Sequence, residues 1–334
     1  IDYKEGANKI NVRNLKLSKK KLVSIDELSV YTLNGEKVNN DFKLSLKNNL
    51  IIKGKNYDSK NLNRIFNNSN NNTLFSNTNA EVKISFDKIT TKLSKQLENF
   101  NLIGKIQRGK FVKINAKGDF NNKEHIDISL KKDSKSEKKY LEIYSDIPEV
   151  LLADYDFFQG LSGGKLLFSS IFEKDLSSSK LIIEDFKVIN APGFIRLLSI
   201  ADYGGMVDLL SGKGLSFDKL ELNFSKDNQG LKLNELFAVG SSVSILMEGY
   251  VESKSGLISL RGTMIPAKNL NKFLSKIPVV GKIIIPKEIG EGLFGVSFKI
   301  KGLPKQTKTS VNPLKTLTPR FITKALEKSK SKAQ

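Results

Sequence analysis

The stretch FGVSFKI, residues 294–300, decides the fold class of this chain. Its apolar side chains stand at every second position, with glycine, serine and lysine between them. Successive side chains of a strand point to opposite faces of a sheet, so this alternation predicts a strand with one buried and one solvated face. The apolar row must then pack on a second layer of protein or on a bound lipid. Its members are Phe294, Val296, Phe298 and Ile300.

The same alternation recurs in the segments that precede this stretch. The connections between them are short and contain the hairpin-type residues Gly, Asn, Asp and Ser, which favours an antiparallel meander. We therefore predict a mainly β fold built from a long antiparallel sheet. Further predicted strands are FDKLELNF (217–224), GLKLNELFAV (230–239), SVSILMEGYV (242–251) and LISLRGTM (257–264).

A few amphipathic helices are expected beside the sheet, because apolar residues recur there every three or four positions. They are predicted over 89–100, over 191–214, around 270–277, and from Thr318 or Pro319 to the basic end of the chain. The terminal helix could lie on an anionic surface or contact a partner, or it could pack on the end of the sheet. Its apolar side consists of Phe321, Ile322, Ala325 and Leu326.

The composition favours a thin, sheet-dominated fold over one with a thick hydrophobic core, because only 39% of the 334 residues are hydrophobic. No run reaches the roughly 18 to 20 apolar residues of a membrane-spanning helix, and the chain begins at Ile1 without a signal-peptide pattern. We expect a piece of a longer or processed chain, with any membrane anchor or export signal upstream.

Catalytic motifs are nearly absent from the sequence. There is no cysteine and a single histidine, His125, which rules out thiolate chemistry and leaves a histidine metal cluster or a catalytic triad without support. Walker-type loops and nucleophile elbows are also missing. We therefore expect a non-enzymatic protein without a cofactor or metal.

The net charge of +20 raises the question of a nucleic-acid partner. Only six of the 55 basic residues are arginine, whereas phosphate and base readers favour the arginine fork. The abundance of Lys, Asn and Ile fits A/T-rich codon usage, and weak attraction to anionic lipid is the next interpretation. We expect no nucleic-acid partner.

Composition also suggests how the chain is divided. An Asn-rich segment at 61–79 predicts an exposed loop, and the charged run 131–139 predicts a turn at a boundary. The expected parts are 1–135, the N-terminal part of the sheet; 136–328, a more regular region; and 329–334, a basic disordered tail.

Five blocks in the second half of the chain resemble, in order, the C-terminal region of the AsmA-like family, especially its YhdP branch in Gram-negative bacteria. Residues 1–135 resemble that family only in their general pattern of short strands and turns, and none of the five blocks lies there. The blocks are DYDFFQGLSGGKL (154–166), EDFKVINAPGFIRLLSIADYGGMVDLLSGKGLSFDKLELNF (184–224), GTMIPAKNLNKFLSKIPVVG (262–281), GEGLFGVSFKIKG (290–302) and VNPLKTLTPRFITKAL (311–326).

The resemblance implies a curved sheet with a U-shaped cross-section, often called a β-taco, whose apolar interior carries phospholipid between the inner and outer membranes. It implies a periplasmic segment anchored in the inner membrane upstream, with an outer-membrane or periplasmic partner at the C-terminal end. The alternative is a structural or regulatory scaffold for outer-membrane assembly that conducts no lipid. The candidate groove residues are Leu220, Leu222, Phe224, Ile245, Met247, Phe294, Val296, Phe298 and Ile300.

Overall fold

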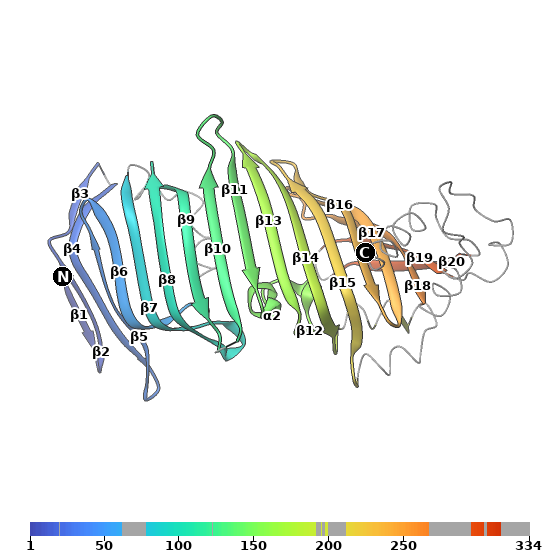
Figure 1. Cartoon of the computed structure of the whole chain (residues 1–334), viewed down its shortest axis with the longest axis horizontal. Coiled ribbons are helices and arrows are strands. Elements are labelled where there is room, and N and C mark those ends of the chain that lie inside the picture. The colour runs from blue at the N-terminus through green and yellow to red at the C-terminus, as the bar shows by residue number, and fades with distance from the viewer. Residues whose placement is uncertain are drawn as a thin grey trace. The chain divides into compact units, whose positions relative to one another are not determined.

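The computed structural model describes residues 1–19, 21–61, 78–121, 123–191, 195, 198–199, 212–266, 295–303 and 306–314. It is mainly β, with twenty strands in an open, mixed sheet (Figure 1). The prediction of a mainly β fold built from a long sheet is therefore confirmed. The chain forms two compact units: unit 1 comprises Ile1–Asp154 and Leu166–Lys174, and unit 2 comprises Tyr155–Lys165 and Asp175–Gln334.

Unit 1 holds twelve of the strands and two short helical turns, η1 (Lys92–Ser94) and α2 (Pro148–Leu152). Its strands are β1 (Asp2–Glu5), β2 (Asn8–Arg13), β3 (Lys16–Ser18), β4 (Lys21–Asn34), β5 (Lys37–Leu46), β6 (Asn49–Asp58), β7 (Ala80–Thr90), β8 (Gln96–Gln107), β9 (Lys110–Asp119), β10 (His125–Lys132), β11 (Lys139–Ser145) and β13 (Lys165–Glu173).

The strands of unit 1 pair in the order β1-β2-β4-β5-β6-β7-β8-β9-β10-β11-β13. The short strand β3 pairs with the first residues of β4, and β2 pairs with later residues of the same strand. Among the described strands, β6 and β7 form the only parallel pair. The sheet is thus mixed rather than purely antiparallel as predicted. Parallel neighbours need a connection of about a dozen residues or more, and residues 59–79, which contain the Asn-rich segment, supply it. Within that segment, residues 62–77 lie outside the described part.

The charged run 131–139 forms a hairpin turn. The backbone N–H of Asp133 donates to the carbonyl of Lys138 at 2.9 Å, and β10 and β11 pair from Lys132 and Lys139 onward. The expected division at 135/136 therefore falls inside a hairpin whose two strands both belong to unit 1.

Unit 2 is an antiparallel meander in which neighbouring strands pair in the order β12-β14-β15-β16-β17-β18-β19-β20. Register shifts in β15 and β16 mark bulges, which bend a strand and increase its twist. Its elements are η2 (Asp156–Phe158), β12 (Leu161–Ser162), β14 (Leu176–Val188), β15 (Leu215–Lys226), β16 (Gly230–Gly240), β17 (Val243–Glu252), β18 (Ile258–Pro266), β19 (Gly295–Gly302) and β20 (Lys308–Leu314).

The predicted helix over 89–100 is wrong, because this segment forms the end of β7, the turn η1 and the start of β8. Ile89 and Leu97 lie directly opposite each other on the two strands. A tight turn between them brings residues eight apart onto one face, and the same spacing also fits a helix. Leu93 lies in the turn and is 60% exposed.

The other predicted helices lie mostly outside the described residues. Within 191–214, Ile195, Leu198 and Ser199 are described as helical. The segments around 270–277 and 318–326 are not described at all. The helix α2 went unpredicted, because its five residues are too few for a helical period to be recognised.

Candidate functional site

Unit 1 carries a continuous row of apolar residues across ten neighbouring strands, which we call the central row. Each member lies directly opposite the next in the register of the sheet, so all ten side chains point to the same face. The central row consists of Val12, Leu28, Leu44, Ile52, Ile84, Leu102, Ala116, Ile128, Ile143 and Phe168.

The central row is only partly covered by the protein itself. Ala116 is 1% exposed, whereas the nine other members keep intermediate exposure. Apolar side chains at such regular spacing form a surface that would gain stability from further apolar cover. The central row is therefore a candidate contact surface for an extended apolar ligand.

An aromatic cluster lies beside the central row on the same face. The ring of Phe86 stacks on Tyr57 with centroids 5.3 Å apart, and Phe42 meets both rings edge-on at 5.8 and 5.9 Å. Gly54 makes room for them, because a Cβ there would lie 2.8 Å from the ring of Phe86 and 2.4 Å from Cβ of Phe42. The hydrophobic cluster around these rings also includes Leu151 of α2, so α2 covers part of this face.

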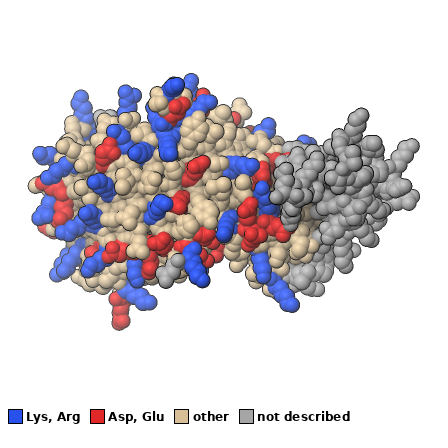
Figure 2. All heavy atoms as spheres, viewed as in Figure 1, with Lys and Arg blue, Asp and Glu red and all other residues tan. Residues whose placement is uncertain are grey.

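The opposite face of the same strands is mainly polar and charged, although it also carries the exposed apolar residues Ile103, Leu167 and Ile171. Opposite charges stand directly across from each other in the register, for example Glu81 with Lys105 at 2.9 Å and Lys117 with Asp127 at 3.2 Å. Figure 2 shows basic and acidic residues interspersed with neutral ones on the visible surface. Such pairs suit a water-facing surface, where each adds only about 0.2–1 kcal/mol.

In unit 2 the register brings the predicted groove residues together in rows on one face. Two of these rows cross β14 to β19, and a third crosses β14 to β20. The rows are Leu181, Leu222, Leu236, Met247, Gly262, Phe298 and Val311; Ile183, Leu220, Ala238, Ile245, Met264 and Val296; and Ser179, Phe224, Leu233, Gly249, Leu260 and Ile300.

These residues are more deeply buried than the central row of unit 1. Phe298 is 2% exposed, Met247 5% and Leu220 6%. The ring of Phe298 lies against Gly262, where a Cβ would come within 2.5 Å of it. Phe298 thus already has a packed environment in this structure. Intermediate exposure remains for Leu222, Phe224, Ile245 and Ile300.

Five of the predicted residues are outside the described residues. Phe294 precedes the described part of β19, and Phe321, Ile322, Ala325 and Leu326 of the predicted terminal helix follow the described part of β20.

The central row itself is missing from the sequence-based candidates. The strand segment AEVKISF (80–86) alternates clearly in sequence, but alternation does not say which residues of distant strands are neighbours. The pairing of β6 with β7 is parallel across a long connection. No local signal could have predicted it.

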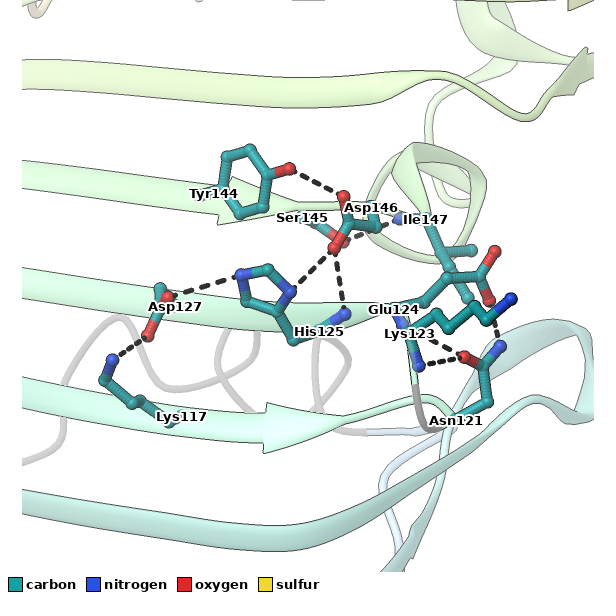
Figure 3. A network of polar contacts seen from close by, with 10 residues as sticks. All are labelled: Lys117, Asn121, Lys123, Glu124, His125, Asp127, Tyr144, Ser145, Asp146 and Ile147. Atoms are coloured by element: carbon teal, nitrogen blue, oxygen red, sulfur yellow. Dashed lines mark hydrogen bonds and ion pairs between the residues drawn. The ribbon is translucent and has the colours of Figure 1, made fainter.

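A polar network on the charged face surrounds the single histidine (Figure 3). Nδ1 of His125 lies 2.8 Å from a carboxylate oxygen of Asp146, and Nε2 lies 3.6 Å from Asp127. The Tyr144 hydroxyl donates to Asp146 at 2.6 Å. This hydrogen bond, with a smaller contribution from burial, raises the pKa of Tyr144 to about 12. The network connects β10 with the segment that leads from β11 into α2, which indicates a structural role.

In the described part of the chain, no three His, Cys, Asp or Glu side chains are grouped closely enough to hold a metal ion. None of the helices in that part has the length and apolar character needed to cross a lipid bilayer.

No protein-family model, curated protein or solved structure matches this chain.

Proposed function

We propose that this chain binds phospholipid acyl chains along its apolar rows and conducts lipid between two membranes. The observation that carries the proposal is the central row, ten apolar residues in direct register with only one of them fully buried. A row of this kind offers nearly uniform apolar contact from strand to strand. Uniform contact allows a lipid to move without stalling at a tight site.

The energetics of lipid transfer require such a surface. Two acyl chains of about 16 methylenes each lose on the order of 25 kcal/mol when they are moved into water, at about 0.8 kcal/mol per methylene. A transfer protein must therefore cover the chains along the whole path. The charged face of the same strands would keep the other side of the sheet in water.

The resemblance to the AsmA-like family, YhdP branch, supports the same proposal. The resemblance implies a location in the periplasm of a Gram-negative bacterium, with an inner-membrane anchor upstream and a partner at the C-terminal end. On this proposal the protein is not an enzyme and needs no cofactor.

Mass spectrometry of lipids that co-purify with the protein tests the proposal. Ile128→Asp places a charge in the central row and should remove most of the bound phospholipid, because a buried carboxylate is strongly disfavoured beside acyl chains. The matched control is Ser129→Asp on the same strand, which faces the other side of the sheet and should leave the lipid load unchanged. Bound lipid that persists in the Ile128→Asp protein, or its absence from the wild type, would contradict the proposal.

A second candidate function is a scaffold for outer-membrane assembly that conducts no lipid. The close packing of Phe298 and Val296 favours it in unit 2, since both are under 10% exposed and leave little room for an acyl chain. Phe298→Asp separates the two functions. The proposed transport predicts that the folded variant loses lipid, whereas a scaffold would unfold locally with no change in lipid content.

A further inference from the structure

Unit 2 contains a concavity on the face opposite its apolar rows. Its volume is about 1400 Å³, and it is lined by residues from the end of β15 through β20. Lys232 on β16 and Lys308 on β20 both line it. The strands between them, β17, β18 and β19, line it as well, so the concavity extends across five neighbouring strands from β16 to β20.

The concavity has an excess of positive charge, because five basic and three acidic residues line it. One register row across it runs through Lys232, Tyr250, Ser259, Lys301 and Lys308, so two of the lysines face each other directly on β19 and β20. Like charges in opposite positions destabilise a sheet. A bound anion would offset that repulsion.

The acidic residues that line the concavity already have partners. Glu248 binds Arg261 at 2.8 Å, Asp227 accepts backbone N–H groups of Gln229 and Gly230 at 2.8 and 3.0 Å, and Glu252 accepts a hydrogen bond from Ser255.

The lysines, by contrast, have no acidic partner within the described residues. None of the four lysines that line the concavity forms an ion pair there. The hydroxyl-bearing residues Ser259, Thr309 and Ser310 line the same space. Ammonium groups together with hydroxyls are suited to binding phosphate oxygens. The four are Lys232, Lys299, Lys301 and Lys308.

A smaller cavity of about 290 Å³ adjoins the concavity. Four residues line both, namely Glu248, Arg261, Lys299 and Ser310. The next register row on this face, Leu246, Thr263 and Ser297, also lines the smaller cavity, and Leu246 and Thr263 are 9% and 7% exposed. The combined space therefore has a cationic part and a less polar part.

We infer that this concavity binds the phosphate group of an anionic amphiphile, with the lysines around the phosphate and the apolar part of the molecule directed towards Leu246. The site lies on the other face of the sheet from the apolar rows, so it does not depend on the proposed lipid conduction. The apolar part of the space favours an amphiphile over a free phosphate ion.

Isothermal titration of the full chain with dihexanoyl phosphatidic acid below its micelle concentration tests the site. Lys301→Glu combined with Lys308→Glu should weaken binding at least tenfold, because two attractive charges become repulsive. The matched control is Lys113→Glu combined with Lys131→Glu. These lysines also face each other directly, carry the same change of charge and lie in unit 1, and this variant should bind within twofold of the wild type.

Two comparisons make the outcome decisive. Inorganic phosphate titrated in the same buffer should bind at least tenfold more weakly than the amphiphile; equal affinity would overturn the role of the apolar part. Equal weakening by both double variants would overturn the site, since net charge alone would then explain the binding.

Lysine acetylation of the wild-type protein gives a readout that does not depend on the folding of any variant. Saturating dihexanoyl phosphatidic acid should slow acetylation of Lys299, Lys301 and Lys308 several-fold relative to Lys113 and Lys131. Unchanged acetylation of the three lysines at saturation would overturn the inference.

Discussion

At the scale of single residues, Asp146 is the acceptor on which the polar network of unit 1 depends. Its carboxylate accepts hydrogen bonds from the Tyr144 hydroxyl at 2.6 Å and from the backbone N–H of His125 at 3.0 Å, and it contacts the imidazole at 2.8 Å. The phenol must stay protonated to donate its bond, and this is why its pKa rises to about 12. The network thus contributes to stability in a way that depends on pH.

We predict that Tyr144→Phe reduces stability at neutral pH but not at strongly alkaline pH. The pKa of Tyr144 is higher in the folded protein, about 12, than in the unfolded chain, about 10. The stabilisation is therefore complete below pH 10 and is lost as the pH rises through 12. Urea unfolding at several pH values should show the difference between wild type and variant shrinking over this interval.

Tyr140→Phe on the same strand is the control for general effects of alkaline pH. Tyr140 is 43% exposed, and its replacement should leave the pH profile of the wild type unchanged. A difference between Tyr144→Phe and wild type that is the same at pH 8 and pH 12 would show that the hydroxyl makes no pH-dependent contribution.

At the scale of elements, the register of strand pairing determines which residues of a strand lie in the apolar rows and which lie on the charged face. In β10, Ile126, Ile128 and Leu130 face the apolar side, whereas Asp127 and Lys131 face the charged side. A shift of one residue exchanges the two faces. The function proposed for the central row therefore depends on the pairing of whole strands as well as on its own ten side chains.

We predict that one alanine inserted between Ser129 and Leu130 destabilises unit 1. The insertion turns Leu130 outwards and Lys131 inwards, and the exposure of the leucine alone costs about 1.5–3 kcal/mol. Urea unfolding followed by circular dichroism should show a lower midpoint. The same insertion between Ser134 and Lys135, in the turn of the hairpin, is the control, because a loop tolerates added length; equal midpoints for the two proteins would contradict the prediction.

The elements also show where sequence reasoning succeeded and failed. Alternation identified the strands that contain Leu222, Met247 and Phe298, because each strand carries its own period of two. It failed at Ile89 and Leu97, where a tight turn between two strands imitates a helical spacing. Periodicity records the separation of residues along the chain and not the turn between them.

At the scale of the whole molecule, the fold class could be predicted but the candidate site only in part. Eight of the predicted groove residues lie in the rows of unit 2, because β15 to β18 are consecutive strands of a meander with short connections. The central row of unit 1 could not be assembled in this way, since Ile52 and Ile84 become neighbours only through a parallel pairing across residues 59–79. The cationic concavity was also missed, because Lys232 and Lys308 are distant in sequence and lysine is common throughout the chain.

The parallel pair also has a consequence for the order of folding. Most other neighbouring strands of unit 1 are joined by short turns and can pair soon after they form. The pairing of β6 with β7 must first close the longer loop of residues 59–79, which carries a larger entropic cost and slows the step. Strands β4 to β6 and strands β7 to β11 should then form as two separately nucleated meanders.

Pulsed hydrogen exchange during refolding would reveal this order. Amides within β4–β5 and within β8–β9 should gain protection before those that join β6 to β7, and simultaneous protection of all three groups would contradict it. During synthesis on the ribosome, the first meander would be complete while the second had yet to emerge. The length of one polar connection, and not the chemistry of the apolar side chains, would then set the time at which the central row becomes continuous.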